Sequence, residues 1–584
     1  MSRIFVLAAL VCVVACVEDA RGDAIIVTRA MKATTIIEVF VSEDSIRVDL
    51  EIGINDLAGF RNLMPDPIYE RMGYEPKPFD RRLGRFFAED WTITAEDGPP
   101  LRGVLANIEA RYRVKRDEIT GEPLPSTLDE REPIVFASLA YALPGRPQSL
   151  TIKPPTREET SFAAADIGFV LYHKGLPVTD FRYLSGPETV DLDWADPWYS
   201  SFRNRNLKRR FSSPLSVYLY VENYEVRKEI IARPKDLQQW IELGLEDADT
   251  ISVSEQEGLK NRVAEFLADK SPVTIDNRTP EPVLDRIHFV RRTLRRTGVI
   301  DPPEDLAAIS ATLGIIYVYP VDSLPEVVTM SWELFSDEIR RVPSSATDEA
   351  GGLPYFLTPG DSILTWQNFL TNPTVPTLVA IATPSAGVPV PLASAVCGVV
   401  VIALLIGFVK KGLRRSPRMV LLIAAFMAAT VLLRPVARVA VPIPGAGGMS
   451  QEETEAVMGG LLTNVYRAFD YRDESTIYDT LKRSATGDLL TKIYLETRQA
   501  LELQNQGGAR VKVKEVGVDS VEARPLEGKK GFVAQCVWTV AGSVGHWGHI
   551  HTRQNQYDAV FTIEAIDGVW KITELELLEE KRVL

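Results

Sequence analysis

The chain has 584 residues, which is too long for a single hydrophobic core and predicts several domains. Its content of 45% hydrophobic and 25% charged residues is ordinary for globular domains. The 65 basic residues against 79 acidic ones give a formal net charge of −14, which argues against nucleic acid as a general partner.

Residues 1–22 have the pattern of a signal peptide. Arg3 provides a short positive region, and the apolar stretch from Ile4 to Ala15 is too short to be a good membrane span. Cleavage after Gly22 is the favoured interpretation, and lipidation of Cys16 within a lipobox-like sequence is the competing one. Both alternatives predict that the chain is exported.

Residues 23–157 are expected to form a β-sandwich-like domain. The sequence "TIIEVFVSEDSIRVDLEIGI" consists of two β-rich runs around a turn, and its second run alternates Ile46, Val48, Leu50 and Ile52 with polar residues. Further strand-like runs follow, separated by proline- and glycine-containing turns. This pattern is typical of an all-β sandwich.

Residues 158–371 are expected to form a second β-rich domain with inserted helices. One helix is predicted from Ser254, because Ser254 and Glu257 have the spacing of a capping box before an apolar stripe. Residues 372–390 are rich in proline and predict a linker.

The sequence "DLDWADPWYS" in this second region offers three carboxylates. Asp191, Asp193 and Asp196 could supply oxygen ligands to calcium. The glycine and the distal glutamate of an EF-hand loop are missing, so a loop held by its aromatic residues is the favoured interpretation.

Residues 391–441 predict a transmembrane hairpin. Residues 391–409 carry no charge and are long enough to span a bilayer, and residues 419–441 form a second candidate span. The connecting loop 410–418 has five basic residues and no acidic one, which places it in the cytoplasm by the positive-inside rule. We therefore expect a bacterial inner-membrane protein with both large parts on the periplasmic side. Two buried core helices are the alternative.

Residues 449–584 are expected to form an α+β domain. Ser450 and Glu453 have capping-box spacing, a second helical pattern follows, and four strand-like runs close the chain. Helices followed by a long antiparallel sheet resemble the cone of the nuclear-transport-factor-2-like (SnoaL-like) fold. This resemblance implies a pocket and no particular chemistry.

Two further stretches carry a resemblance of the whole chain. The sequences "VKRDEITGEPLP" and "DLDWADPWYSSFRNRNL" are similar to those of a family of uncharacterised bacterial envelope proteins. The family implies no known activity.

The stretch "GHWGHIH" near the C-terminus holds three of the five histidines of the chain. Strand alternation puts one set of polar residues on the face that becomes apolar further along, which predicts the polar wall of a pocket. The pocket candidates are His549, His551, Arg553, Asn555 and Tyr557. A hydrogen-bonded sheet end without a ligand is the alternative interpretation.

Neither a metal nor a cofactor is expected. His546, His549 and His551 are the candidate metal ligands, but no clear fourth ligand follows them in the sequence. The chain has none of the common phosphate-binding, zinc-protease or paired-cysteine motifs.

The sequence therefore favours a non-catalytic scaffold or ligand-sensing component of the cell envelope, anchored in the membrane. Its expected partners are the membrane, other envelope proteins or a small ligand. The alternative is an enzyme whose active pocket is the region of His551, Arg553 and Tyr557.

Overall fold

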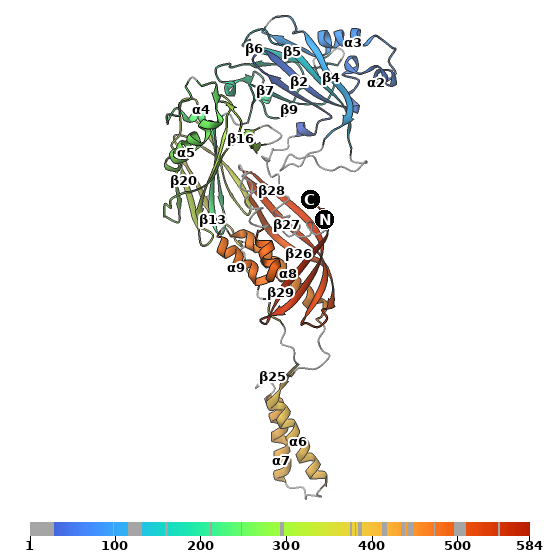
Figure 1. Cartoon of the computed structure of the whole chain (residues 1–584), viewed down its shortest axis with the longest axis vertical. Helices are drawn as coiled ribbons and strands as arrows, with labels where there is room; N and C mark the ends of the chain where they lie inside the picture. Colours follow the sequence, from blue (N-terminus) through green and yellow to red (C-terminus); the bar gives the residue numbers. More distant parts are fainter. Residues whose placement is uncertain are drawn as a thin grey trace.

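The computed structural model describes most of the chain after its first 28 residues. The described residues are 29–96, 98–114, 131–157, 160, 162–210, 213–246, 248–292, 297–373, 377–379, 381–383, 388–410, 417–433, 438–441, 449–471, 473–495, 510–546 and 549–583. The expected signal peptide, 1–22, lies outside them. The described residues are mostly β-strand and form three large hydrophobic cores, which define three units (Figure 1).

The first unit, 29–210, packs two sheets against each other. Its strands are β1 (Thr35–Val41), β2 (Ser45–Gly53), β3 (Thr92–Ala95), β4 (Gly103–Tyr112), β5 (Pro133–Ala142), β6 (Ser149–Lys153), β7 (Ile167–His173), β8 (Leu176–Pro177), β9 (Arg182–Tyr183), β10 (Glu188–Asp191) and β11 (Ser201–Phe202). The larger sheet has the order β4-β5-β2-β1-β7-β8, with β9 also on β7, and the smaller has the order β11-β10-β6-β3.

Alternation along the strands explains why these two sheets meet. Ile46, Val48, Leu50 and Ile52 of β2 are fully buried and share one core with Ile93, Ile152 and Val190 of the smaller sheet. Two short helices, α2 (Asp66–Arg71) and α3 (Phe79–Arg85), add to this unit. The 3-10 turn η6 (Pro197–Tyr199) lies between β10 and β11.

The second unit, 213–373, is built on a seven-stranded sheet. Its strands are β12 (Ser216–Val221), β13 (Glu225–Ala232), β14 (Thr250–Ile251), β15 (Val273–Ile275), β16 (Val283–Arg292), β17 (Thr297–Val299), β18 (Leu306–Ala307), β19 (Leu313–Pro320), β20 (Val327–Ser331), β21 (Val342–Asp348), β22 (Gly351–Leu357) and β23 (Ile363–Gln367). The large sheet has the order β17-β16-β19-β13-β12-β21-β22, and β15-β20-β23 form a smaller one.

Two helices belong to the second unit, α4 (Pro234–Leu237) and α5 (Val253–Lys270). The helix α5 packs Leu259, Val263 and Leu267 into the core. Its capping box is formed by Ser252 and Glu255, so the box that the sequence suggested at Ser254 and Glu257 is wrong by two residues. Ser252 and Ser254 each have a glutamate three residues later, so spacing alone does not distinguish the two registers.

The third unit combines two helices and a four-stranded antiparallel sheet. The helices are α8 (Gln451–Arg467) and α9 (Glu474–Ser484), and the 3-10 turn η8 (Ala468–Asp470) joins them. The strands β26 (Arg510–Pro525), β27 (Gly531–His546), β28 (His549–Ile566) and β29 (Val569–Arg582) follow in sheet order. The helix α8 begins after Ser450, whose capping box with Glu453 was predicted from the sequence and is confirmed.

A separate helical hairpin lies at one end of the molecule in Figure 1. It contains α6 (Leu392–Lys410) and α7 (Pro417–Leu432), and the short strands β24 (Val388–Pro391) and β25 (Arg438–Val441) pair at its base. Since 377–383 and α8 both belong to the third unit, the hairpin is an insertion within that unit.

The transmembrane hairpin expected at 391–409 and 419–441 is a wrong prediction. In the described part of the chain, no helix combines the length and apolar character needed to cross a membrane. The second segment does not continue as a helix, because α7 ends at Leu432 and Arg438–Val441 is strand β25. The 16 residues of α7 extend about 24 Å at about 1.5 Å per residue, against about 30 Å of bilayer hydrocarbon. The expected membrane partner and inner-membrane location are wrong for the same reason, and residues 411–416 of the expected cytoplasmic loop 410–418 lie outside the described residues.

Candidate functional site

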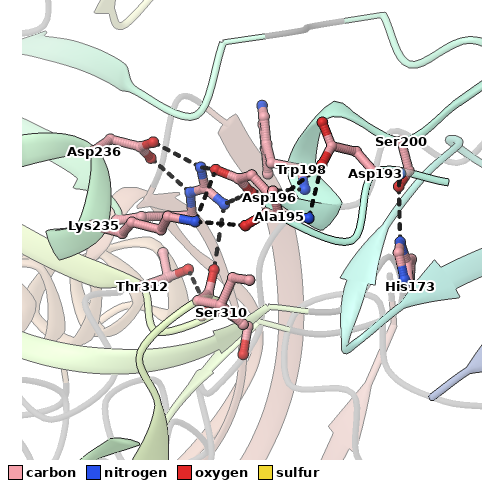
Figure 2. A network of polar contacts seen from close by, with 12 residues as sticks. His173, Asp193, Ala195, Asp196, Trp198, Ser200, Lys235, Asp236, Ser310 and Thr312 are labelled. Carbon is pink, nitrogen blue, oxygen red and sulfur yellow. Dashed lines mark hydrogen bonds and ion pairs between the residues drawn. The ribbon is translucent and has the colours of Figure 1, made fainter. Parts of the chain in front are cut away.

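The loop between β10 and β11 holds one carboxylate of the first unit against the second unit. Asp193 Oδ1 accepts hydrogen bonds from the main-chain N–H groups of Ala195 and Asp196, both at 2.9 Å. Asp196 then caps η6 by accepting from the N–H of Trp198 at 3.0 Å. These turns fix the main chain on both sides of Asp196, and Figure 2 shows its side chain beside Lys235 and Asp236 of the second unit.

Arg233, at the end of β13, joins the two units. Its Nη1 and Nη2 donate to the two carboxylate oxygens of Asp196 at 2.8 and 2.9 Å. Its Nε and Nη2 donate to the two oxygens of Asp236 at 2.6 and 2.7 Å, and Nη1 also donates to the carbonyl of Ile309 at 3.3 Å. All five guanidinium N–H groups are therefore used, with Arg233 only 1% exposed. We call Asp196, Arg233 and Asp236 the clamp.

The electrostatics of the clamp favour the charged forms of Arg233 and Asp196 but not that of Asp236. Burial opposes the charge of Arg233, but hydrogen bonds with Asp236 and Asp196 outweigh it and raise the pKa of the guanidinium. Burial also opposes the charge of Asp196, and the hydrogen bond and positive charge of Arg233 lower the pKa of that carboxyl below its ordinary value. Burial dominates at Asp236 and raises its pKa, because Asp236 is less exposed than Asp196.

Aromatic and basic side chains surround the clamp. The ring of Trp198 lies between two guanidinium groups, with its centroid 4.0 Å from Arg209 and 5.2 Å from Arg233. Arg209 also donates to the Trp198 carbonyl, and Lys235 donates to the carbonyl of Ala195 at 2.9 Å. Cations over a tryptophan face are attracted by the negative potential of the ring.

A buried histidine supports the same loop from inside the first unit. His173 Nδ1 lies 2.8 Å from Ser200 Oγ, which accepts a hydrogen bond from the Asp193 N–H at 2.9 Å (Figure 2). Burial, with the nearby charge of Lys174, lowers the pKa of His173 to about 4, so its imidazole is neutral at pH 7. His173 and Ser200 are 0% and 1% exposed, so this pair does not present a nucleophile to solvent.

A second junction joins the second and third units through two reciprocal hairpins. The turn after β12 extends to the third unit, where Glu222 pairs with Lys512 and the Tyr224 ring lies 5.1 Å from that of Tyr471. In return, the β27–β28 hairpin approaches β13, where Arg227 Nη2 donates to the Gly545 carbonyl at 2.9 Å. Burial and a hydrogen bond with Tyr471 raise the pKa of Tyr224 to about 12.

The face of the large sheet beneath this second hairpin is buried and charged. Arg227 Nε lies 3.0 Å from the carboxylate of Glu229, and their side chains are 3% and 0% exposed. The guanidinium also lies over the Tyr220 ring, at 4.4 Å from its centroid. A Cβ at Gly545 would lie 3.2 Å from Tyr220, so the absence of a side chain at Gly545 permits the close approach.

The pocket candidates predicted from the sequence lie along β28. His551 and Arg553 pair through their main chains with Val544 and Gly542, and His546 pairs with His549 across the hairpin. The side chains of His546, His549, His551 and Arg553 lie outside the described residues. Their role as a pocket wall therefore stays a prediction.

The other two pocket candidates lie inside the third core. Asn555 and Tyr557 are 3% and 0% exposed, and Asn555 donates to the Tyr557 hydroxyl at 3.1 Å and to Glu580 at 3.2 Å. Tyr557 stacks on Trp538 with ring centroids 5.2 Å apart. The neighbouring Thr552 is exposed, so the two faces of β28 differ as strand alternation requires.

Within the described residues, no group of three or more histidine, cysteine, aspartate or glutamate side chains could hold a metal ion. The calcium interpretation of the β10–β11 loop also fails on geometry. Asp191 pairs with Arg203 at 2.8 Å, Asp193 accepts from the main chain, and Asp196 binds Arg233, so the three carboxylates point to three different partners.

Asp196 was predicted as a candidate ligand from the sequence, whereas Arg233 and Asp236 were not. The sequence separation of 37 residues between Asp196 and Arg233 leaves no local signal for their pairing. The spacing of Arg233 and Asp236 at the start of α4 is a weak signal, since residues three apart are neighbours on a helix.

No protein-family model matches the chain, and no curated protein matches it. Among solved structures, the intermembrane space region of the chloroplast protein ARC6 aligns with 22% of this chain and 98% of its own, at 17% sequence identity and a TM-score of 0.18. A TM-score this low carries no argument about fold or function.

Proposed function

We propose that this protein is a non-catalytic scaffold that holds its three β-rich units in a fixed relative orientation, so that surfaces on different units are presented together. The observation that carries the proposal is the clamp. A guanidinium fork that uses all its donors on two carboxylates and a carbonyl allows one geometry, whereas a contact between apolar surfaces tolerates sliding.

Burial of the clamp adds to this argument. A buried ion pair gains little net stability over an apolar contact of the same shape, because desolvation offsets the attraction between the charges. Its better attested role is to specify one arrangement among several. Arg233 and Asp236, at 1% and 4% exposed, fit that role at the boundary of two units.

The second junction supports the proposal independently. Two hairpins from different units dock on each other, and one of them ends on a buried Arg227–Glu229 pair. If the interface moved freely, Arg227 would lose its hydrogen bond to the Gly545 carbonyl, and the buried Arg227–Glu229 pair would lose the cover of the third unit.

The alternative of an enzyme gains no support from the described titratable groups near the clamp. The pair most like a base and nucleophile, His173 and Ser200, is buried. Burial raises the pKa of Cys536 in the third core to about 12, which keeps that thiol protonated and unreactive.

The proposal is tested by the distance distribution between the first and second units. Labels at two exposed positions, Glu70→Cys and Asn261→Cys in a Cys12→Ser, Cys16→Ser, Cys397→Ser background, should give one narrow distribution in the otherwise unchanged chain. Asp196→Ala should broaden it, because the first unit loses its contact with Arg233. The matched control is Asp191→Asn, which removes an exposed pair beside the same loop and should leave the distribution narrow. A narrow distribution in the Asp196 variant would contradict the proposal.

A further inference from the structure

A short extended segment before the helical hairpin is bound on the surface of the third unit. We call residues 377–379 and 381–383 the strap. Ala382 forms an antiparallel bridge with Val569, at the start of β29. The Trp570 N–H donates to the Ile381 carbonyl at 3.1 Å, and the Thr383 N–H donates to the Gly568 carbonyl at 3.0 Å. The strap thus extends the sheet edge through main-chain hydrogen bonds.

The helix α8 recognises the other end of the strap with one side-chain amide. Asn464 Oδ1 accepts from the Val379 N–H at 2.7 Å, and its Nδ2 donates to the Val379 carbonyl at 2.9 Å. The Asn464 side chain, which is 1% exposed, therefore forms hydrogen bonds with both the N–H and the carbonyl of Val379. This contact does not depend on which side chain the strap carries at that position.

Side-chain specificity comes from one small residue on α8. A Cβ on Gly460 would lie 3.1 Å from two atoms of Ile381 and 3.4 Å from Val379, so the absence of a side chain lets both aliphatic groups approach the helix. Ile381 packs against the third core, while Val379 remains 45% exposed. The site therefore packs one aliphatic side chain, Ile381, against the core and contacts a second, Val379, two residues earlier in the chain.

From these contacts we propose that the site formed by Gly460, Asn464 and Gly568–Trp570 is a docking site for an extended segment of a partner polypeptide, which the strap occupies in cis. The partner segment carries β-branched aliphatic residues two positions apart, in place of Val379 and Ile381. Main-chain pairing at a sheet edge with pockets for alternate side chains is a general way to bind peptides. The proposal adds a partner to the scaffold and does not depend on the clamp.

Competition with the strap sets how the partner binds. A tethered segment acts at an effective concentration on the order of millimolar, so a free peptide of the same sequence competes poorly until the strap is released. Weakening the strap in cis should therefore raise the apparent affinity for the free peptide, while weakening the site should lower it.

The experiment uses the full chain and a fluorescent peptide with the sequence of residues 377–383, "TLVAIAT". Binding is followed by fluorescence anisotropy. The release variant Ile381→Asp should bind the peptide at least tenfold more tightly than the unchanged protein does. Adding Asn464→Ala to the release variant should reverse that gain, since it removes both hydrogen bonds to Val379. A control peptide with aspartate in place of the isoleucine should not bind.

A second release variant protects the test against misfolding. Thr383→Pro removes the main-chain N–H and the side-chain hydroxyl of Thr383, which both donate to the Gly568 carbonyl, and keeps Ile381 in place. Tenfold tighter binding by either folded release variant supports the proposal. Equal peptide binding by the unchanged protein and the folded release variants overturns it. Loss of the near-ultraviolet circular dichroism signal in both variants also overturns it, because the strap would then be an integral part of the fold. A dimer in which two copies exchange their straps, detected by light scattering, would overturn the proposal of a separate partner, because the bound segment would then come from a second copy of this chain.

Discussion

The two junctions between units are held together by different kinds of contact. Between the first and second units, the contact centres on the clamp, in which one guanidinium binds two carboxylates, and Lys235 adds a hydrogen bond to the Ala195 carbonyl. Between the second and third units, the contact spreads over two hairpins and includes a side chain to main chain bond, Arg227 to Gly545, and a pair of tyrosine rings. The contacts of the first junction centre on one residue, Arg233, whereas those of the second are spread over several residues of two hairpins.

The difference teaches where each junction is vulnerable. When one residue of a buried charged cluster is removed, the remaining charges stay buried without their partner. When one residue of a contact spread over many residues is removed, the other interactions stay in place. The first junction should therefore respond strongly to single substitutions, and the second should respond weakly to most of them.

The largest effect is expected for Arg233→Ala. This substitution leaves the buried Asp236 without its guanidinium partner and Asp196 with only Lys235, at 3.6 Å, and should destabilise the joined units by about 3–5 kcal/mol. Urea unfolding followed by tryptophan fluorescence measures it. The triple variant Asp196→Leu, Arg233→Met, Asp236→Leu should recover most of the loss, because no charge is then left unpaired. If Arg233→Ala costs less than about 1 kcal/mol, the clamp is not the centre of that junction.

A buried cation without a carboxylate provides the contrast to Arg233. Lys228, on the core side of β13, donates from Nζ to the Ser271 carbonyl at 2.6 Å and to Ser271 Oγ at 2.8 Å, at the end of α5. Burial lowers its pKa to about 7. The unfolded chain therefore binds more protons between pH 7 and about 10.5, and the free energy of unfolding should rise with pH across that window.

Lys228→Met should remove this pH dependence. In the unchanged protein the free energy of unfolding should rise by on the order of 3 kcal/mol between pH 7 and 10, and this rise should disappear in the variant. Urea unfolding at several pH values measures it, with Lys270→Met, a partly exposed position at the end of α5, as the control. A slope that persists in Lys228→Met would assign the pH dependence to other groups.

A smaller effect is expected at the second junction. Lys512→Ala removes the partner of Glu222 in a pair whose side chains are 24% and 19% exposed, and should cost about 1 kcal/mol. High salt should reduce the difference between the variant and the unchanged protein, because solvent ions screen partly exposed charges. Thermal unfolding at low and high salt provides the comparison. A loss as large as that of Arg233→Ala would erase the distinction between the two junctions.

The smallest effect is expected for Asp191→Asn. Asp191 ends β10, just before the loop that carries Asp196. Its pair with Arg203 is 53% and 62% exposed, so its loss should change stability by no more than about 0.5 kcal/mol. The same urea unfolding assay measures it. A loss above 1 kcal/mol would show that the whole loop, and not Asp196 alone, carries the junction.

Local patterns in the sequence predicted local structure well. The alternation of Ile46, Val48, Leu50 and Ile52 marks the buried face of β2, and the capping box at Ser450 marks the start of α8. These features depend on residues within a few positions of each other. The capping box of α5 was misplaced, because Ser252 and Ser254 both have a glutamate three residues later.

Long-range contacts explain what the sequence could not predict. All eight residues of β13 are buried, although its charged residues Arg227 and Glu229 alternate like those of a solvent-facing strand. The third unit covers that face, and no local sequence pattern shows that another unit packs on the strand. The clamp was missed for the same reason. The expected membrane hairpin failed because hydropathy gave no sign that Arg438–Val441 would leave the helix and pair with β24.

The central claim, that the junctions hold the units in one arrangement, is tested most directly by small-angle X-ray scattering of the full chain. The account predicts that one fixed arrangement of the three units fits the scattering curve of the unchanged protein, and that Asp196→Ala requires a mixture of arrangements. A curve for the unchanged protein that only a mixture can fit, or an unchanged curve for Asp196→Ala, would contradict it.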